Sequence, residues 1–143
     1  LLMPKFMLKD AIRDFDRLNM RTVREMATHF DVSLTAMAYR LVESDFHPSL
    51  LLAYGKDGRR WFVRSKSIDE KWFPKNTLDR ESSAYSILFE GAEDDGHMST
   101  IDGDTWFDVG WADQVELGEQ SFRAQDDEVV TLLVARSDRM LAD

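Results

Sequence analysis

Residues 22–41, TVREMATHFDVSLTAMAYRL, decide how the N-terminal part of this chain folds. Apolar side chains recur at three- and four-residue intervals on both sides of residues 30–32, which predicts two short amphipathic helices joined by a tight turn. Thr22 and Glu25 have the spacing of a capping box, so the first helix is expected to begin at Thr22. Ser33 is the expected N-cap of the second helix, because its hydroxyl can accept a hydrogen bond from a free backbone N–H. The pattern is that of a helix-turn-helix.

Two further features extend this unit over residues 1–46. Asp31 occupies the turn position where glycine is usual, and aspartate tolerates the left-handed conformation better than most residues. Apolar residues at helical spacing predict another helix over residues 5–18. A break follows at residues 45–48, because a proline forces the residue before it into an extended conformation. We therefore expect a three-helix, helix-turn-helix-like connector.

The rest of the chain, residues 47–143, has a different period. Two apolar runs flank a turn at residues 55–58 and predict a β-hairpin whose faces are both covered, since polar alternation is weak. A helix is expected over residues 78–89, capped at residues 76–77 and ended by Gly91. The expected strands span residues 50–54, 59–64, 98–102, 105–109, 115–124 and 128–135. This order of elements predicts an α+β domain with an antiparallel sheet.

Composition limits the classes of function. The chain has 143 residues, of which 43% are hydrophobic and 11% aromatic, enough for a packed core. It has no cysteine, which excludes disulfides and thiol chemistry. No apolar run approaches the roughly 20 residues that a membrane span needs, so no membrane partner is expected. The net charge of −9 repels phosphate backbones, and DNA is not the expected partner, although bases gather between residues 56 and 80.

Three pieces of the sequence resemble the ImmA/IrrE family of metallopeptidase-like regulators. They are L-L-M-P at residues 1–4, M-A-T-H-F-D-V-S at residues 26–33 with Ala36 and Arg40-Leu41 after it, and V-E at residues 115–116 followed by E-V-V-T-L-L at residues 128–133. In that family a similar L-L-M-P follows the last metal ligand of the peptidase domain. The resemblance implies a cytoplasmic bacterial regulator of transcription or of a stress response.

The zinc-binding His-Glu-x-x-His helix of that family has no counterpart here, since the three histidines are His29, His47 and His97. We therefore expect a non-catalytic C-terminal portion of such a regulator, without a cofactor of its own. Zinc is implied only for the missing upstream peptidase domain. Larger members end in a GAF-like sensor domain, and the pattern of residues 47–143 is compatible with one. The expected partners are the upstream peptidase domain, a repressor protein or a small-molecule signal, and a second copy of the chain.

A DNA-binding helix-turn-helix regulator is the alternative function. A recognition helix starting at Ser33 is expected to present Leu34, Thr35, Ala38 and Tyr39 outward. None of these is a usual reader of base edges. The candidate DNA contacts are Arg24, Thr35, Tyr39 and Arg40. Because the motif contains few basic residues, a structural helical unit is favoured over a DNA reader.

Aromatic residues indicate where a small molecule could bind. The candidate ligand-pocket residues are Trp61, Tyr85, Trp106 and Trp111. A pocket between sheet and helix would be lined in this way, but so would an ordinary core, which is the more frequent outcome. Trp72 and Trp111 lie outside the expected regular elements and are expected to face a groove or a partner.

Metal binding is not expected. His29 lies beside Phe30 on the predicted helix, where a partly buried or surface histidine is commoner than a metal ligand. His97 lies among several acids, but their spacing matches no EF-hand loop. These acids are Glu93, Asp94, Asp95, Asp102 and Asp104. A solvated acidic hairpin is the favoured interpretation.

Overall fold

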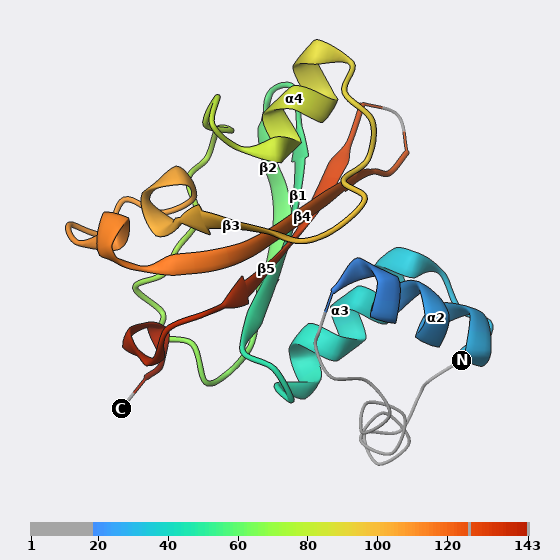
Figure 1. Ribbon diagram of the computed structural model, residues 1–143, viewed down its shortest axis with the longest axis horizontal. Coiled ribbons are helices and arrows are strands. Elements are labelled where there is room, and N and C mark those ends of the chain that lie inside the picture. The colour runs from blue at the N-terminus through green and yellow to red at the C-terminus, as the bar shows by residue number, and fades with distance from the viewer. Residues whose placement is uncertain (1–18, 126, 143) are drawn as a thin grey trace.

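The computed structural model describes residues 19–125 and 127–142 and confirms the predicted α+β class (Figure 1). The three helices of this part of the chain are α2 (Met20–Phe30), α3 (Leu34–Ser44) and α4 (Ser83–Glu90). The strands are β1 (Ser49–Gly55), β2 (Gly58–Arg64), β3 (Ser99–Asp102), β4 (Glu116–Arg123) and β5 (Val129–Ala135). They form one antiparallel sheet in the order β2-β1-β5-β4-β3. The helix expected over residues 5–18 and the L-L-M-P at residues 1–4 lie outside the described residues.

Helix α2 begins earlier than its capping-box pattern predicts. Its N-cap is Asn19, whose side chain accepts a hydrogen bond from the backbone N–H of Thr22 at 3.0 Å. The capping box of Thr22 and Glu25 is therefore wrong. The first turn is also stabilised from outside, because the N–H of Met20 donates to Gln120 Oε1 on β4 at 2.9 Å. Sequence spacing cannot reveal this cap, because its acceptor lies 100 residues away.

The turn between the two helices follows the prediction. Asp31 ends α2 in the left-handed conformation, with φ of 53°, and its N–H bonds to carbonyls of the last turn. Ser33 caps α3, and its hydroxyl accepts from the N–H of Ala36 at 3.1 Å. Both contacts satisfy polar groups that helix ends leave free.

Helices α2 and α3 pack on one face of the sheet (Figure 1). Their buried residues include Met20, Val23, Met26, Met37 and Leu41. The sheet contributes Leu51, Ala53, Phe122, Val130 and Leu132 to the same cluster. The helices and the sheet therefore share one core across the expected boundary at residue 46. None of the helices in the described residues has both the length and the apolar character needed to cross a membrane.

The predicted hairpin is confirmed as β1 and β2, and β1 is buried along its whole length. Alternate side chains of β1 enter different cores, because successive residues of a strand point to opposite faces. Leu51 belongs to the helix-side cluster, and Leu52 belongs to the cluster on the other face. Strand β2 is one of the two edge strands, and most of its residues are only half-buried.

Two elements differ from their predicted bounds. Helix α4 begins at Ser83 with Ser82 as its N-cap, later than expected, and ends at Gly91 as predicted. Residues 105–109 do not form the expected strand. The chain instead makes a 3₁₀ turn at Gly103–Thr105. Gly103 makes this turn fit, because an added Cβ would lie 2.7 Å from the carbonyl oxygen of Ala112.

Candidate functional site

The chain that follows β2 folds back along the outer edge of that strand. The backbone N–H of Arg59 donates to the carbonyl of Asn76 at 2.7 Å. The Arg59 guanidinium Nη1 donates to the carbonyls of Pro74 and Lys75, at 2.7 and 3.3 Å. These bonds hold residues 74–76 against β2 and limit the ability of this edge strand to pair with another strand.

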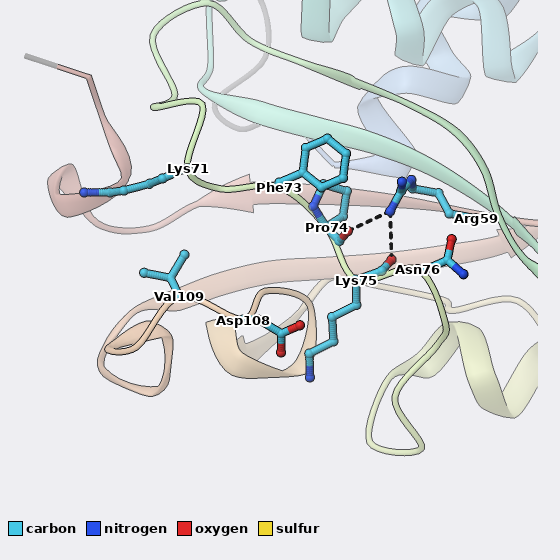
Figure 2. A pocket seen from close by; sticks show the side chains of 8 residues that line it. All are labelled: Arg59, Lys71, Phe73, Pro74, Lys75, Asn76, Asp108 and Val109. Atoms are coloured by element: carbon cyan, nitrogen blue, oxygen red, sulfur yellow. Dashed lines mark hydrogen bonds between the residues drawn. The ribbon is translucent and has the colours of Figure 1, made fainter.

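A surface groove of about 440 Å³ opens between this segment and the loop after the 3₁₀ turn (Figure 2). It is lined by Arg59, Lys71, Phe73, Pro74, Lys75, Asn76, Asp108 and Val109. Its volume falls in the range of small-molecule sites, about 300–1,000 Å³. Figure 2 shows Lys71 at one end of the groove and Arg59 at the other. Three cations and one carboxylate, that of Asp108, line it, so its charge is positive.

Aromatic rings hold the cations of this region. The Arg59 guanidinium carbon lies 4.8 Å from the centre of the Phe73 ring and 5.5 Å from that of Phe62. Phe62 also supports Arg64, at 5.7 Å. Phe73 is 55% exposed, although it is a large apolar side chain. An exposed ring beside a guanidinium offers both an apolar and a cationic contact.

A second cation pair lies at the other end of the groove. The Lys71 ammonium lies 4.9 Å from the centre of the Trp111 ring, and the Arg139 guanidinium carbon lies 4.5 Å from it. Both cations therefore pack on the same indole ring. Lys71 connects this pair to the groove, because it also lines the groove itself.

Most of these cations lack an acidic partner. Within residues 19–125 and 127–142, no carboxylate forms a salt bridge with Arg59, Arg64, Lys71 or Arg139. Lys75 does pair with Asp79, at 3.4 Å. Residues 56–80 contain eight bases and four acids, whereas the whole chain has a charge of −9. The region is thus a positive patch on an acidic protein.

The floor of the groove is fixed to the core. The Tyr54 hydroxyl donates to the carbonyl of Lys75 at 2.5 Å, and the N–H of Lys75 donates to the carbonyl of Trp106 at 2.9 Å. Burial raises the pKa of Tyr54 to about 12, so its hydroxyl stays protonated and remains a donor. These hydrogen bonds fix the segment that carries the groove cations to the core.

Glu119 is a buried carboxylate that sequence patterns did not identify. It lies in the middle of β4 and is 4% exposed. The Trp106 indole N–H donates to Oε2 at 2.8 Å, and the backbone N–H of Ser83 donates to Oε1 at 3.2 Å. Burial raises the pKa of Glu119, and the nearby Asp95 carboxylate adds to this effect. An acid among buried strand residues was the available signal.

The arrangement around Glu119 is that of a structural joint. Each of its oxygens accepts a hydrogen bond from the protein, so its acceptor groups are used internally. The neighbouring hydroxyls bond to one another, from Ser83 to Ser121 at 2.8 Å and from Ser121 to Thr131 at 2.7 Å. These contacts connect the start of α4 to β4 and β5.

The four candidate pocket residues lie in different surroundings. Trp61 packs against Tyr39 of α3, with ring centres 6.0 Å apart. Trp106 is buried beside Tyr54, and Trp111 packs on Lys71 and Arg139. Tyr85 stacks with Phe89 and lines a smaller hollow of about 240 Å³ with Gly55, Lys56, Gly58, Thr77 and Leu78.

Trp72 was expected to face a groove, and this expectation is wrong. Its side chain is fully buried and makes edge contacts with Phe107 and Trp111. The segment that carries Trp72 lies outside the helices and strands, but it packs over the face of the sheet opposite α2 and α3. Trp111 is partly exposed beside the groove.

The candidate DNA contacts do not form a positive surface. Arg24 is exposed on α2, and Thr35 is half-buried on α3. Tyr39 is 40% exposed but packs on Trp61. Arg40 lies 3.8 Å from the Glu43 carboxylate, which offsets its charge. Ala38, expected to face outward, is instead buried in the core below α3.

Two acids near His97 have a structural role. Asp94 accepts from the N–H of Arg123 at 2.8 Å, and Asp95 accepts from the N–H of Ser121 at 2.8 Å. They bind the part of β4 that extends beyond its pairing with β3. Asp94 is exposed and Asp95 is half-buried, so these surface acids also hold the loop against β4. Groups of three or more histidines and acids suited to a metal ion are absent from the described residues.

The fold and the groove define an α+β protein with a positively charged surface groove supported by aromatic rings. No family model matches this sequence, and no curated protein matches it either.

Proposed function

We propose that this chain is a non-catalytic regulatory module that recognises an anionic signal in the groove between Arg59 and Lys71. The observation that carries the proposal is the set of four cations without salt-bridge partners in the described part of an acidic chain. Unpaired cations held on aromatic rings are ready to bind an anion without first breaking an ion pair.

The proposal extends to the whole regulator through the resemblance to the ImmA/IrrE family. In the proposed regulator, residues 47–143 act as a GAF-like sensor domain, and residues 1–46 act as a helix-turn-helix-like connector to an upstream peptidase domain. The core shared by α2, α3 and the sheet supports this arrangement, because a change in the sheet would reach the helices directly.

The groove can be tested with small anions. Inorganic phosphate and citrate, at constant ionic strength set with chloride, are expected to raise the melting temperature of the full chain in proportion to the logarithm of their concentration. The double variant Lys71→Gln/Arg139→Gln is expected to lose this stabilisation. Arg24→Gln removes an exposed charge from α2, on the other side of the sheet, and is the matched control. Equal stabilisation of the wild type, the double variant and Arg24→Gln by phosphate and citrate would refute the proposed anion site.

A further inference from the structure

We infer that the anion recognised by this surface is an acidic, extended segment of a partner polypeptide, an inference that rests on the proposed anion-binding function. The cations extend beyond the groove. Arg64 lies on β2 with Arg59, Lys71 lies at the opposite end of the groove, and Arg139 packs on Trp111 together with Lys71. None of these four residues forms a salt bridge with a carboxylate in the described residues. We call these four residues the cation strip.

The spacing of the cation strip favours a chain over a compact ion. A single small anion is bound best by donors that converge on one point, as in a phosphate cradle. Here the cations are held apart in two pairs, one on Phe62 and one on Trp111. In an extended segment, alternate side chains point the same way and lie about 7 Å apart, so repeated carboxylates can reach separate cations.

The contacts within the groove match an acidic peptide in two more ways. Arg59 and Arg64 each donate Nη1 to backbone carbonyls, of Pro74 and Lys75 and of Trp72 respectively. Their Nε and Nη2 groups form the second edge of the guanidinium, and such an edge can bind an aspartate or glutamate side chain through two parallel hydrogen bonds. The exposed ring of Phe73 offers a contact for an apolar side chain between the acids. The side chains that line the groove are spread from Lys71 to Arg59, so the groove presents an elongated set of contacts (Figure 2).

The charge of the rest of the protein supports the same partner. An acidic segment is repelled by a chain with a net charge of −9 except where the cation strip lies, so the strip sets the position at which it docks. The backbone of the edge strand β2 is already occupied at Arg59 by the carbonyl of Asn76. Side chains, rather than strand pairing, therefore carry this recognition.

The test uses the full chain and a fluorescein-labelled peptide of about ten residues, whose extended length is roughly 33 Å. The peptide alternates glutamate with threonine and contains one phenylalanine. A second peptide replaces each glutamate by glutamine, and a single-stranded oligonucleotide of equal charge serves as a third probe. Binding is measured by fluorescence anisotropy at several salt concentrations, with inorganic phosphate as competitor.

The acidic peptide is expected to bind, more weakly as salt increases, and the glutamine peptide is expected not to bind. Lys71→Gln/Arg139→Gln is expected to reduce affinity by about tenfold, since two charge contacts are lost. Arg24→Gln is expected to change affinity by less than about twofold, since it lies away from the strip. Phe73→Ala, tested alone, is expected to weaken binding without changing its salt dependence.

Other outcomes separate the two proposals. Thermal stabilisation by phosphate or citrate without binding of the acidic peptide would overturn the polypeptide partner and leave the anion site standing. An oligonucleotide that binds as tightly as the acidic peptide would also overturn the polypeptide partner. Equal peptide binding by the wild type and Lys71→Gln/Arg139→Gln would overturn the cation strip, and absence of binding by every anion would overturn both proposals.

Discussion

The two faces of the sheet are built differently. One is covered by two regular helices, α2 and α3, whose apolar stripes meet the sheet in a cluster of buried aliphatic and methionine side chains. The other is covered by one short helix, α4, and by irregular segments that carry Trp72, Trp106 and Phe107. Buried polar contacts, such as the Trp106–Glu119 hydrogen bond, occur on this second face. Regular periodicity explains the packing of the first face, to which the Met20–Gln120 hydrogen bond adds a long-range polar contact, whereas the irregular segments of the second face depend on such contacts.

This difference has a consequence for function. Helices hydrogen-bond their own backbone, so their packed faces need few outside partners. Irregular segments must find partners for their backbone elsewhere, which is why Arg59 and Tyr54 bind carbonyls of Pro74 and Lys75. The groove forms where these anchored segments meet, on the irregular side. Binding surfaces often lie on such connecting segments, because the sequence of a connecting segment can vary while the rest of the fold holds it in place.

The largest expected effect tests whether the two faces unfold together. Leu51 and Leu52 are adjacent in β1 and fully buried, but they face opposite cores. Leu51→Ala and Leu52→Ala are each expected to lower the free energy of unfolding by about 2–5 kcal/mol. Circular dichroism and tryptophan fluorescence should report the same transition in both variants. Loss of helical signal before the fluorescence change in Leu51→Ala would show that the faces are independent.

Thr100→Ala is the control for this pair. Thr100 is exposed on β3, so its replacement is expected to change the free energy of unfolding by less than about 0.5 kcal/mol.

The next comparison is between two buried tryptophans of the irregular face. Trp106 donates to Glu119, whereas the indole N–H of Trp72 has no hydrogen-bond partner in the described part of the chain. Trp106→Phe leaves a buried carboxylate oxygen without a donor, so it is expected to cost about 1–3 kcal/mol more than Trp72→Phe. Urea denaturation of both variants measures the difference. Equal losses would mean that the Glu119 contact contributes nothing net.

The pH dependence of stability tests the Glu119 joint more directly. The pKa of Glu119 is raised above its usual value of 4.5, mainly because the group is buried. The folded state therefore holds this proton more tightly than the unfolded state, and stability falls as pH rises from about 4.5 through the raised pKa. Glu119→Gln removes this titration.

The free energy of unfolding of Glu119→Gln, relative to that of the wild type, is thus expected to increase as pH rises from about 4 to about 8. Parallel curves for the two proteins would contradict the assignment. His47 gives an opposite contribution that both proteins share. Burial lowers its pKa from 6.5, so its contribution to stability is lost as pH falls below that value.

The smallest expected effects concern two aspartates in the left-handed conformation. Asp31 ends α2 with φ of 53°, and Asp45 ends α3 with φ of 59°. Asp31→Gly is expected to stabilise the protein by about 0.5–1 kcal/mol, because glycine adopts this conformation without a Cβ clash. Asp45→Gly is expected to destabilise it by about 1 kcal/mol, because two hydrogen bonds from Ser67 are lost. Thermal melts compare the two, and stabilisation by both changes would mean that the Ser67 contacts contribute nothing.

Local elements of the fold could be predicted where the signal is local. The cap at Ser33, the left-handed turn at Asp31 and the β1–β2 hairpin all depend on residues within a few positions of one another. The start of α2 was missed because Gln120 helps to cap it from β4. The burial of Trp72 was missed because no periodic pattern marks the segment that carries it.

The candidate site could be predicted only in part. The excess of bases between residues 56 and 80 is visible in the sequence, and so is the aromatic content. Of the four predicted aromatic pocket residues, Trp111 lies beside the groove, in contact with Lys71. Phe73, the exposed ring of the groove itself, is not among the predicted pocket residues. Aromatic type alone does not distinguish a core residue from a surface one.

The sequence by itself determined the α+β class, the two helices after Asn19 and five of the six expected strands, because hydrophobic periodicity is a property of consecutive residues. It also determined that positive charge gathers in one segment. Only the tertiary structure decided that Arg59, Arg64, Lys71 and Arg139 stay without carboxylate partners in the described residues while Glu119 becomes buried. Pairing and burial depend on segments brought together from distant parts of the chain, and no local pattern specifies that meeting.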